Sequence, residues 1–301
     1  MHPDTQVIIY GTGSLSEKIT NELKERYEIL FYLDSNQDKC GNYFEGKEIK
    51  SPEILTEIKN TILVVVASSF YDEIKITLCE IGLQEHVNFV DGSIFLPEYH
   101  ADISYSQNGE DIILNNILKQ KTGFYVDIGS YHPIRFSNTY KFYRKGWTGI
   151  NIEPTPNKIH LFNIVRPKDI NIEVGVSSED DLKELYIYKE NAYNTLDKNL
   201  VEERFIHRGL KYEEKAILTF KRLDTILGDL NLDGFQIDFM NIDVEGHELE
   251  VLKSNNWDYY SPIVIAIEIF NLEESPLLSF LLEKGYKLEA KTPNTAIFMK
   301  I

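Results

Sequence analysis

Short apolar runs alternate with amphipathic stretches twice along this chain of 301 residues. This alternation is typical of helices wrapped around a mainly parallel sheet, because each helix returns the chain to the same edge of the sheet. The expected strands of the first series are 7–11, 28–34, 61–68 and 87–92, and its expected helices are 14–25 and 71–81. The pattern therefore predicts an α/β chain made of two units in tandem.

The second series begins with an expected helix at about 109–119 and ends with an expected antiparallel hairpin, YKLEA and TAIFMK around the turn TPN. Its expected strands between these are 124–129, 149–153, 170–176, 237–243 and 263–269. The pattern lapses in LPEYHADISY, between Leu96 and Tyr105, which marks a linker. We therefore expect a smaller domain at 1–98 and a larger one at 99–301.

The composition excludes several classes of protein. A formal net charge of -17 disfavours nucleic acid as a partner, because phosphate binding needs clustered Lys and Arg. Only Cys40 and Cys79 occur, without CxxC spacing, so neither a disulfide framework nor a thiolate zinc site is expected, and a reducing cytoplasm fits best. The start MHPDTQVIIYG lacks the features of a signal peptide, and no apolar run is long enough to span a membrane. An oligomer is compatible with the sequence.

Polar residues follow two expected strands of the second unit. Asp127 and Gly129 lie at the end of FYVDIGSYHP, and Glu153 ends TGINIEP. Ligands of open α/β sheets bind at the carboxyl ends of strands, where a carboxylate can accept hydrogen bonds from both hydroxyls of a ribose. A single glycine, in place of GxGxxG, favours a cofactor without phosphate, such as S-adenosylmethionine. The alternative is that Asp127 caps the next segment and Glu153 is a solvated strand end.

Residues 104 to 270 resemble the FkbM family of S-adenosylmethionine-dependent methyltransferases. The stretches that carry the resemblance are SYSQNGEDIIL, FYVDIGSYHPIRFSNTYKFYRKGWTGINIEPTP, MNIDVEGHELEVLKS and IVIAIEI. The resemblance implies a class I methyltransferase fold, which is Rossmann-like, with a seven-stranded sheet that ends in an antiparallel hairpin. It also implies methyl transfer to a hydroxyl of a sugar or natural product.

The same resemblance implies a set of cofactor contacts. Asp127, Gly129 and Ser130 would contact the methionine part, and Glu153 would contact the ribose. Two residues of SQNGED would close over the pocket, and two residues of INIEVGVSS would lie near the adenine. These four residues are Gln107, Glu110, Val174 and Gly175.

The stretch MNIDVEGHE supplies the first candidates for catalysis. Asp243 and Glu245 lie two residues apart at the end of an expected strand, which aims both to the same side if the chain stays extended. They would act as general bases or as oxygen ligands of Mg²⁺ or Ca²⁺, and the sequence leaves both roles open. Acid pairs also occur at helix entrances because of the helix dipole. His132 is a further candidate base, because an unperturbed imidazole titrates near neutral pH, and the alternative is a histidine with a structural role.

The acceptor side is expected at the end of IVIAIE and in a long polar segment. Glu268 would bind acceptor hydroxyls. The segment 190–215 would be a lid over the acceptor, with Tyr193, Asn194 and His207 among its contacts. The alternative for this segment is an oligomer contact or disorder.

The first unit carries a partial dinucleotide fingerprint. In GTGSLS the third glycine is replaced by Ser16, and Asp34 ends the second expected strand, where a ribose-binding acid belongs. This predicts a small Rossmann-like domain, similar to the nucleotide-sugar-binding domains that precede enzymes of bacterial glycan assembly. Two functions follow: an O-methyltransferase for a sugar in a nucleotide-linked or surface-glycan precursor, or a nucleotide-sugar-binding or NAD-dependent protein whose first domain is active.

Overall fold

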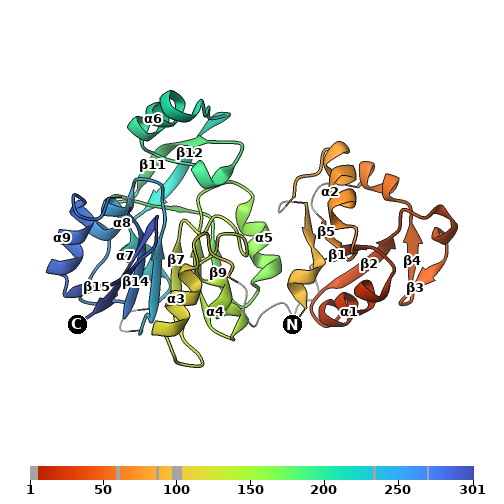
Figure 1. Ribbon diagram of the computed structural model, residues 1–301, viewed down its shortest axis with the longest axis horizontal. Helices are drawn as coiled ribbons and strands as arrows, with labels where there is room; N and C mark the ends of the chain where they lie inside the picture. Colours follow the sequence, from red (N-terminus) through yellow and green to blue (C-terminus); the bar gives the residue numbers. More distant parts are fainter. Residues whose placement is uncertain (1–5, 59–61, 86–87, 97–103, 233–234, 270) are drawn as a thin grey trace. The chain divides into compact units, whose positions relative to one another are not determined.

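The computed structural model describes residues 6–58, 62–85, 88–96, 104–232, 235–269 and 271–301. The chain divides into two compact units, Met1–Ile103 and Ser104–Ile301 (Figure 1). The domain boundary expected at residues 98 and 99 lies outside the described residues. Within the described part of the chain, no helix is long and apolar enough to cross a membrane.

The first unit is a six-stranded sheet, parallel except where β3 meets β4. In spatial order its strands are β3 (Tyr43–Phe44), β4 (Lys47–Lys50), β2 (Glu28–Leu33), β1 (Gln6–Tyr10), β5 (Leu63–Val66) and β6 (Phe89–Asp91). Its helices are α1 (Ser14–Leu23) and α2 (Tyr71–Glu80), with 3-10 turns η1 (Gln37–Lys39), η2 (Pro52–Thr56) and η3 (Gly92–Phe95). The prediction of a Rossmann-like α/β unit is confirmed, and only the short strands β3 and β4 were not expected.

The second unit is built on a seven-stranded sheet. In spatial order its strands are β15 (Tyr286–Lys291), β16 (Thr295–Lys300), β14 (Val264–Glu268), β13 (Phe239–Ile242), β7 (Phe124–Ile128), β8 (Thr148–Ile152) and β9 (Ile170–Ile172). The strands from β14 to β9 are parallel, and the final hairpin of β15 and β16 is antiparallel. The predicted sheet with its terminal hairpin is confirmed.

The strand order reverses between β7 and β13. From β7 the chain proceeds outward through β8 to β9, and it then returns to place β13 and β14 on the other side of β7. At such a reversal the connections leave the sheet in opposite directions, which opens a crevice at the carboxyl ends of the strands. The fold therefore favours a ligand site just after Ile128 and Ile242, the last residues of β7 and β13.

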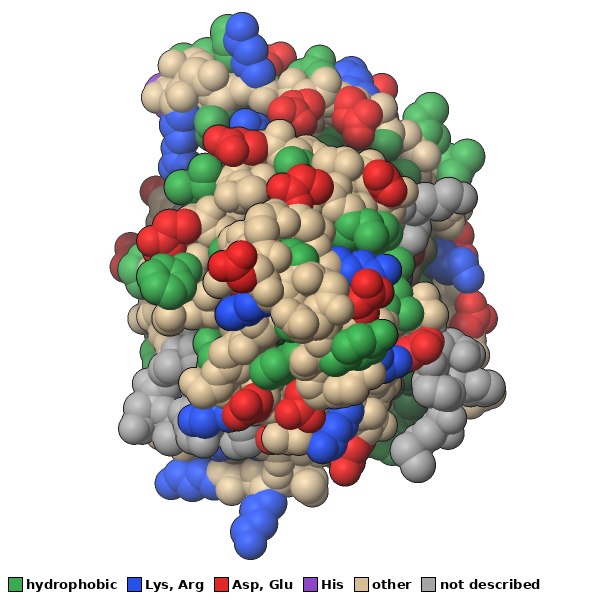
Figure 2. Space-filling view, turned by 90° about the vertical axis from the view of Figure 1, so that its right-hand side faces the viewer, with side chains coloured by type: hydrophobic (Ala, Val, Ile, Leu, Met, Phe, Trp, Pro, Cys, Tyr) green, Lys and Arg blue, Asp and Glu red, His purple; other side chains and the backbone are tan. Residues whose placement is uncertain are grey.

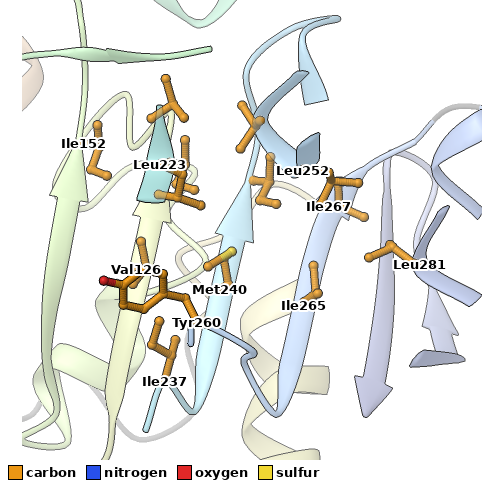
Figure 3. Close-up of a cluster of buried hydrophobic side chains, with 14 of the residues drawn as sticks. Val126, Ile152, Leu223, Ile237, Met240, Leu252, Tyr260, Ile265, Ile267 and Leu281 are labelled. Carbon is orange, nitrogen blue, oxygen red and sulfur yellow. The ribbon is translucent and has the colours of Figure 1, made fainter. Parts of the chain in front are cut away.

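Successive residues of a strand point to opposite faces of the sheet, so the apolar strands present buried side chains on both faces. Helices cover each face. Met240, Ile265 and Leu252 belong to one core, which also includes side chains of α7 (Leu223–Asp229), α8 (Glu248–Lys253) and α9 (Pro276–Glu283) (Figure 3). The other face carries a second core, to which α3 (Glu110–Ile117) and α4 (Tyr140–Arg144) contribute. The remaining helix before β9 is α5 (Lys158–Val165).

A second, three-stranded sheet follows β9 and was not expected. Its spatial order is β10 (Gly175–Val176), β12 (Glu214–Lys221) and β11 (Asp181–Ile187). The strand expected at 170–176 is therefore wrong in its extent, because the chain leaves the main sheet after Ile172. A Cβ on Gly175 would come within 2.1 Å of the Phe220 ring, so glycine is what allows β10 to lie against β12.

The polar segment 190–215 is folded as well. It contains η5 (Asn191–Tyr193), α6 (Lys198–Arg208) and the start of β12. The Asp197 side chain caps α6 by accepting a hydrogen bond from the backbone N–H of Asn199 at 2.8 Å, and Gly209 ends the helix in a left-handed conformation. Apolar periodicity is weak here because α6 buries only Arg204.

The face of the molecule in Figure 2 carries Lys and Arg side chains scattered among Asp and Glu. On this face the basic side chains do not gather into one patch.

Ile265 and Ile217 provide a matched test of the core. Ile265 is fully buried in β14, whereas Ile217 on β12 is 72% exposed. Ile265→Ala should lower the free energy of unfolding by about 2–5 kcal/mol, because it leaves a cavity. Ile217→Ala should change it by less than about 0.5 kcal/mol. Urea unfolding followed by tryptophan fluorescence measures both, since Trp147 and Trp257 lie in the second unit; equal effects would contradict this packing.

Candidate active site

A cavity of about 280 Å³ lies at the carboxyl ends of the central strands, where the strand order reverses. Its lining comes from the ends of β7, β8, β13 and β14 and from the segment before α6. The lining includes most of the residues singled out from the sequence: Gln107, Glu110, Asp127, Gly129, Ser130, Glu153, Val174, Tyr193, Asn194, Asp243, Glu245 and Glu268.

The turn after β7 is the centre of the site. Gly129 has φ +75°, and a Cβ there would lie 1.8 Å from the backbone oxygen of Asp243. The backbone N–H of Asp243 donates to the carbonyl of Ile128 at 3.0 Å, so the two strand ends are in direct contact. Glycine is thus required for the close approach of two backbone segments, in addition to the ligand approach inferred from the sequence.

Asp127 is buried beneath the cavity, at 1% exposure. Its two carboxylate oxygens accept hydrogen bonds from the Thr139 hydroxyl at 2.5 Å and from the Asn241 amide at 2.9 Å. Burial raises the pKa of Asp127, and the nearby Arg166 guanidinium opposes this rise. The carboxylate therefore joins β7 to β13 at the point where both enter the site.

Arg166 is fully buried and carries this network further. Its guanidinium donates to Asp169 at 2.8 Å, to the Tyr125 hydroxyl at 2.7 Å and to the Thr139 hydroxyl at 3.0 Å. Asp169 in turn accepts from the backbone N–H of Gly149 in β8 at 2.9 Å. One buried cation thus links β7 and β8 below the cavity.

Glu153 follows β8 and is fixed by two backbone groups. Its carboxylate accepts hydrogen bonds from the N–H of Tyr131 and from the N–H of Thr155, both at 2.8 Å. Each oxygen keeps a second lone pair, and Glu153 lines the cavity at 6% exposure. The side chain is therefore held in one orientation with acceptor capacity left over.

Gln107 and Glu110 are tied to the turn of the terminal hairpin, which the sequence did not suggest. The Thr292 hydroxyl donates to Glu110 at 2.7 Å, and the Asn294 amide donates to Gln107 at 3.3 Å. Glu110 also accepts from the backbone N–H of Asn108 at 2.8 Å. Two segments far apart in sequence thus meet at this edge of the cavity.

Three carboxylates gather at the ends of β13 and β14. One oxygen from each of Asp243, Glu245 and Glu268 lies within 4.8 Å of the others. Burial raises the pKa of all three, and their mutual repulsion adds to the rise for Asp243 and Glu268. For Glu245 the rise is opposed by Arg204, whose guanidinium contacts it. We refer to Asp243, Glu245 and Glu268 below as the carboxylate cluster.

The segment before α6 forms another wall of the cavity. Asn194 donates to the Thr155 hydroxyl at 2.9 Å. Glu190 accepts from the Tyr131 hydroxyl at 2.6 Å and from the Arg135 guanidinium at 3.1 Å. Polar groups therefore face the cavity from this side as well.

Three residues expected in the site do not line the cavity: His132, Gly175 and His207. Nδ1 of His132 accepts from the backbone N–H groups of Ile134 and Arg135 at 3.0 and 2.9 Å, so this nitrogen shapes the turn and is not placed to take a proton from a ligand. Gly175 packs on Phe220, and His207 is exposed on α6.

Several residues of the site were missed from the sequence. Asn241 is the one that the sequence could most readily have revealed, because an amide inside the apolar strand FMNI is unusual and needs a hydrogen-bond partner when it is buried. Arg166 and Arg204 gave no such signal, because Arg166 directly follows α5 and Arg204 lies in α6, places where a charged residue is ordinarily solvated. Their partners are far away in sequence.

The fingerprint of the first unit has a different geometry from an open nucleotide site. The Ser16 hydroxyl donates to the carbonyl of Gly11 at 2.6 Å, inside the loop. Asp34 accepts from Lys39 at 2.7 Å and also contacts the Thr12 hydroxyl. The acid that would bind a ribose is therefore already engaged by a cation, and nothing in this loop favours the first unit as the active one.

Two family models match separate parts of the chain. Residues 127–288 match the family model described as "Methyltransferase FkbM domain", and residues 4–87 match the one described as "C2185-like, N-terminal". No curated protein matches the chain.

Two solved structures are similar to this chain, one over most of its length and the other over about a quarter of it. A methyltransferase FkbM from Methylobacillus flagellatus KT has 16% identity and a TM-score of 0.40, covering 98% of this chain and 90% of that one. A UDP-D-quinovosamine 4-dehydrogenase from Vibrio fischeri has 23% identity and a TM-score of 0.23, covering 27% of this chain and 74% of that one.

Removal of Arg166 tests the network below the cavity. Arg166→Met should lower the free energy of unfolding by about 3–5 kcal/mol, because Asp127 and Asp169 stay buried without their cation. Lys221→Met breaks an exposed ion pair with Asp229 and should cost at most about 1 kcal/mol. Thermal and urea unfolding measure both variants, and an Arg166 variant as stable as the Lys221 variant would show that the network is dispensable.

Proposed function

The chain belongs to the FkbM methyltransferase family, and we propose that it methylates a hydroxyl of a sugar with S-adenosylmethionine as the donor. The acceptor we propose is a sugar in a nucleotide-linked or surface-glycan precursor. The observation that carries the proposal is the cavity itself: a fixed carboxylate with spare acceptor capacity, Glu153, and an acidic cluster line the same cavity at the strand-order reversal.

The cofactor fits along the turns after β7 and β8. Glu153 is held by two backbone N–H groups and can accept hydrogen bonds from the two ribose hydroxyls. Val174 and Val176, both buried, give an apolar surface for the adenine. The methionine end would lie over Gly129 and Ser130, where the turn contains a single glycine and no phosphate-binding motif.

The chemistry follows from this placement. The acceptor oxygen attacks the methyl carbon, the C–O bond forms, and the C–S bond breaks with its electron pair going to sulfur, which leaves as a neutral thioether. The hydroxyl proton passes to a carboxylate of the cluster, with Asp243 the first choice. Positioning can supply about 7–11 kcal/mol of the barrier, and a base typically adds ~10²- to 10⁴-fold.

The charge of the lining favours a neutral acceptor group. Among the described lining residues are seven carboxylates and one guanidinium, that of Arg135. A phosphate would be repelled by this surface, whereas a sugar ring offers hydroxyls to carboxylate acceptors and to the amide of Asn194. We therefore propose that the sugar enters the cavity and that any linked phosphate stays outside it.

Glu153 gives the first test. The full chain should bind S-adenosylmethionine and S-adenosylhomocysteine in calorimetry, and Glu153→Ala should weaken both by about ten- to a hundredfold, the ~1.5–3 kcal/mol of hydrogen bonds to a charged group. Glu173→Ala is the matched control, because Glu173 is an exposed carboxylate just after the next strand and does not line the cavity. Binding of NAD and not of either sulfur compound would overturn the proposal.

Asp243 gives the second test. With labelled S-adenosylmethionine and a panel of nucleotide-linked sugars, Asp243→Asn should lower kcat by about 10²- to 10⁴-fold, because a base acts mainly in the transition state. Affinity for S-adenosylhomocysteine should stay close to that of the unsubstituted protein. A variant that keeps full turnover would exclude Asp243 as the base.

A further inference from the structure

We propose that the carboxylate cluster of Asp243, Glu245 and Glu268 is a binding site for one divalent cation that prefers oxygen ligands, such as Mg²⁺, Mn²⁺ or Ca²⁺. The three residues follow or end neighbouring parallel strands, β13 and β14, so the fold itself brings them to one point. Three carboxylates and no thiol or imidazole within the cluster is the ligand set of a hard cation.

The spacing of the ligand atoms suits such an ion. One oxygen from each residue lies within 4.8 Å of the other two. Two oxygens bound to the same Ca²⁺ lie at most about 4.6–5.2 Å apart, and two bound to the same Mg²⁺ at most about 4.0–4.2 Å, which is twice the usual bond lengths. A limit of 4.8 Å therefore places the three carboxylates near enough to share one ion once their side chains close around it.

The environment of Glu268 supports a cation site independently of the spacing. It is the last residue of β14, its side chain lines the cavity, and it is only 8% exposed. Within the described part of the chain its carboxylate has no hydrogen-bond or ion-pair partner, in contrast to the buried Glu110 and Glu153. A buried carboxylate left without a partner is costly, and it is aimed at two further acids.

The surroundings leave the cluster short of positive charge. Arg204 contacts Glu245, and Glu248 accepts from the backbone N–H groups of Val244 and Gly246, both at 3.1 Å. Asp243 and Glu268 form no ion pair with a described residue, and the Arg204 charge acts on Glu268 only from a distance. A bound divalent ion would supply positive charge to the ionised cluster.

The ion would act on the acceptor, a consequence that rests on the proposed function. A hydroxyl oxygen bound to a cation is more acidic and is held in place for attack on the methyl carbon. The balance of the step stays the same: the C–O bond forms, the C–S bond breaks, and the proton leaves to a carboxylate oxygen that does not bind the ion.

Metal binding can be measured without any acceptor. The full chain is stripped with a chelator and titrated with MnCl₂, MgCl₂ or CaCl₂ by calorimetry, with electron paramagnetic resonance to count bound Mn²⁺. We expect one site in the unsubstituted protein. Glu268→Gln and Asp243→Asn should each weaken binding by more than about tenfold, as the loss of a charged ligand does. Glu250→Gln, on α8 and outside the cavity, should bind like the unsubstituted protein.

The outcomes separate the two proposals, because S-adenosylhomocysteine affinity is measured on the same samples. One cation site that Glu268→Gln abolishes supports the inference, even if S-adenosylhomocysteine fails to bind and the proposed function falls. No binding of any of the three cations at millimolar concentration overturns it. So does binding that Glu268→Gln and Asp243→Asn leave unchanged while circular dichroism shows both variants folded.

Discussion

The cavity of the second unit depends on the hydrogen bonds of one buried guanidinium, that of Arg166. A charge removed from water costs several kcal/mol unless partners compensate it, and Arg166 meets this with Asp169, two hydroxyls and the faces of aromatic rings such as Tyr125. Through the Thr139 hydroxyl its influence reaches Asp127, and from there Asn241 in β13. Three central strands are thereby held in register at the end where the ligands would enter.

The cavity above this network combines two kinds of acid. Glu153 and Glu110 are held by hydrogen bonds and keep fixed orientations, which suits recognition of a ligand's hydroxyls and polar groups. Asp243 and Glu268 lack such partners among the described residues and are free to bind a proton, a cation or an acceptor. Gly129 makes the combination possible, because any Cβ there would push the Asp243 backbone away. An acid-rich cavity also suits a cofactor that carries a positive sulfonium.

The sequence was sufficient to predict the two main sheets, because buried parallel strands are continuous apolar runs. It also indicated where several strands end, because acids such as Asp127 and Glu153 interrupt those runs. It could not show what a side chain faces. His132 follows the β7 turn as a base would, yet its Nδ1 turns to backbone N–H groups. The sheet of β10, β11 and β12 was missed because the first half of β11 and most of β12 are exposed and lack the apolar run of a buried strand. The contact of Arg204 with Glu245 joins residues far apart in the sequence, so no local pattern indicated it.

We propose that one cavity in the second unit binds the methyl donor with its reacting end toward the carboxylate cluster. A crystal structure with S-adenosylhomocysteine tests it most directly. We expect ribose hydroxyls within hydrogen-bond distance of Glu153, adenine against Val174 and Val176, and the sulfur on the side of Asp243. A ligand bound in the first unit, or one in the cavity with its ribose away from Glu153 and its sulfur turned from the cluster, would contradict it.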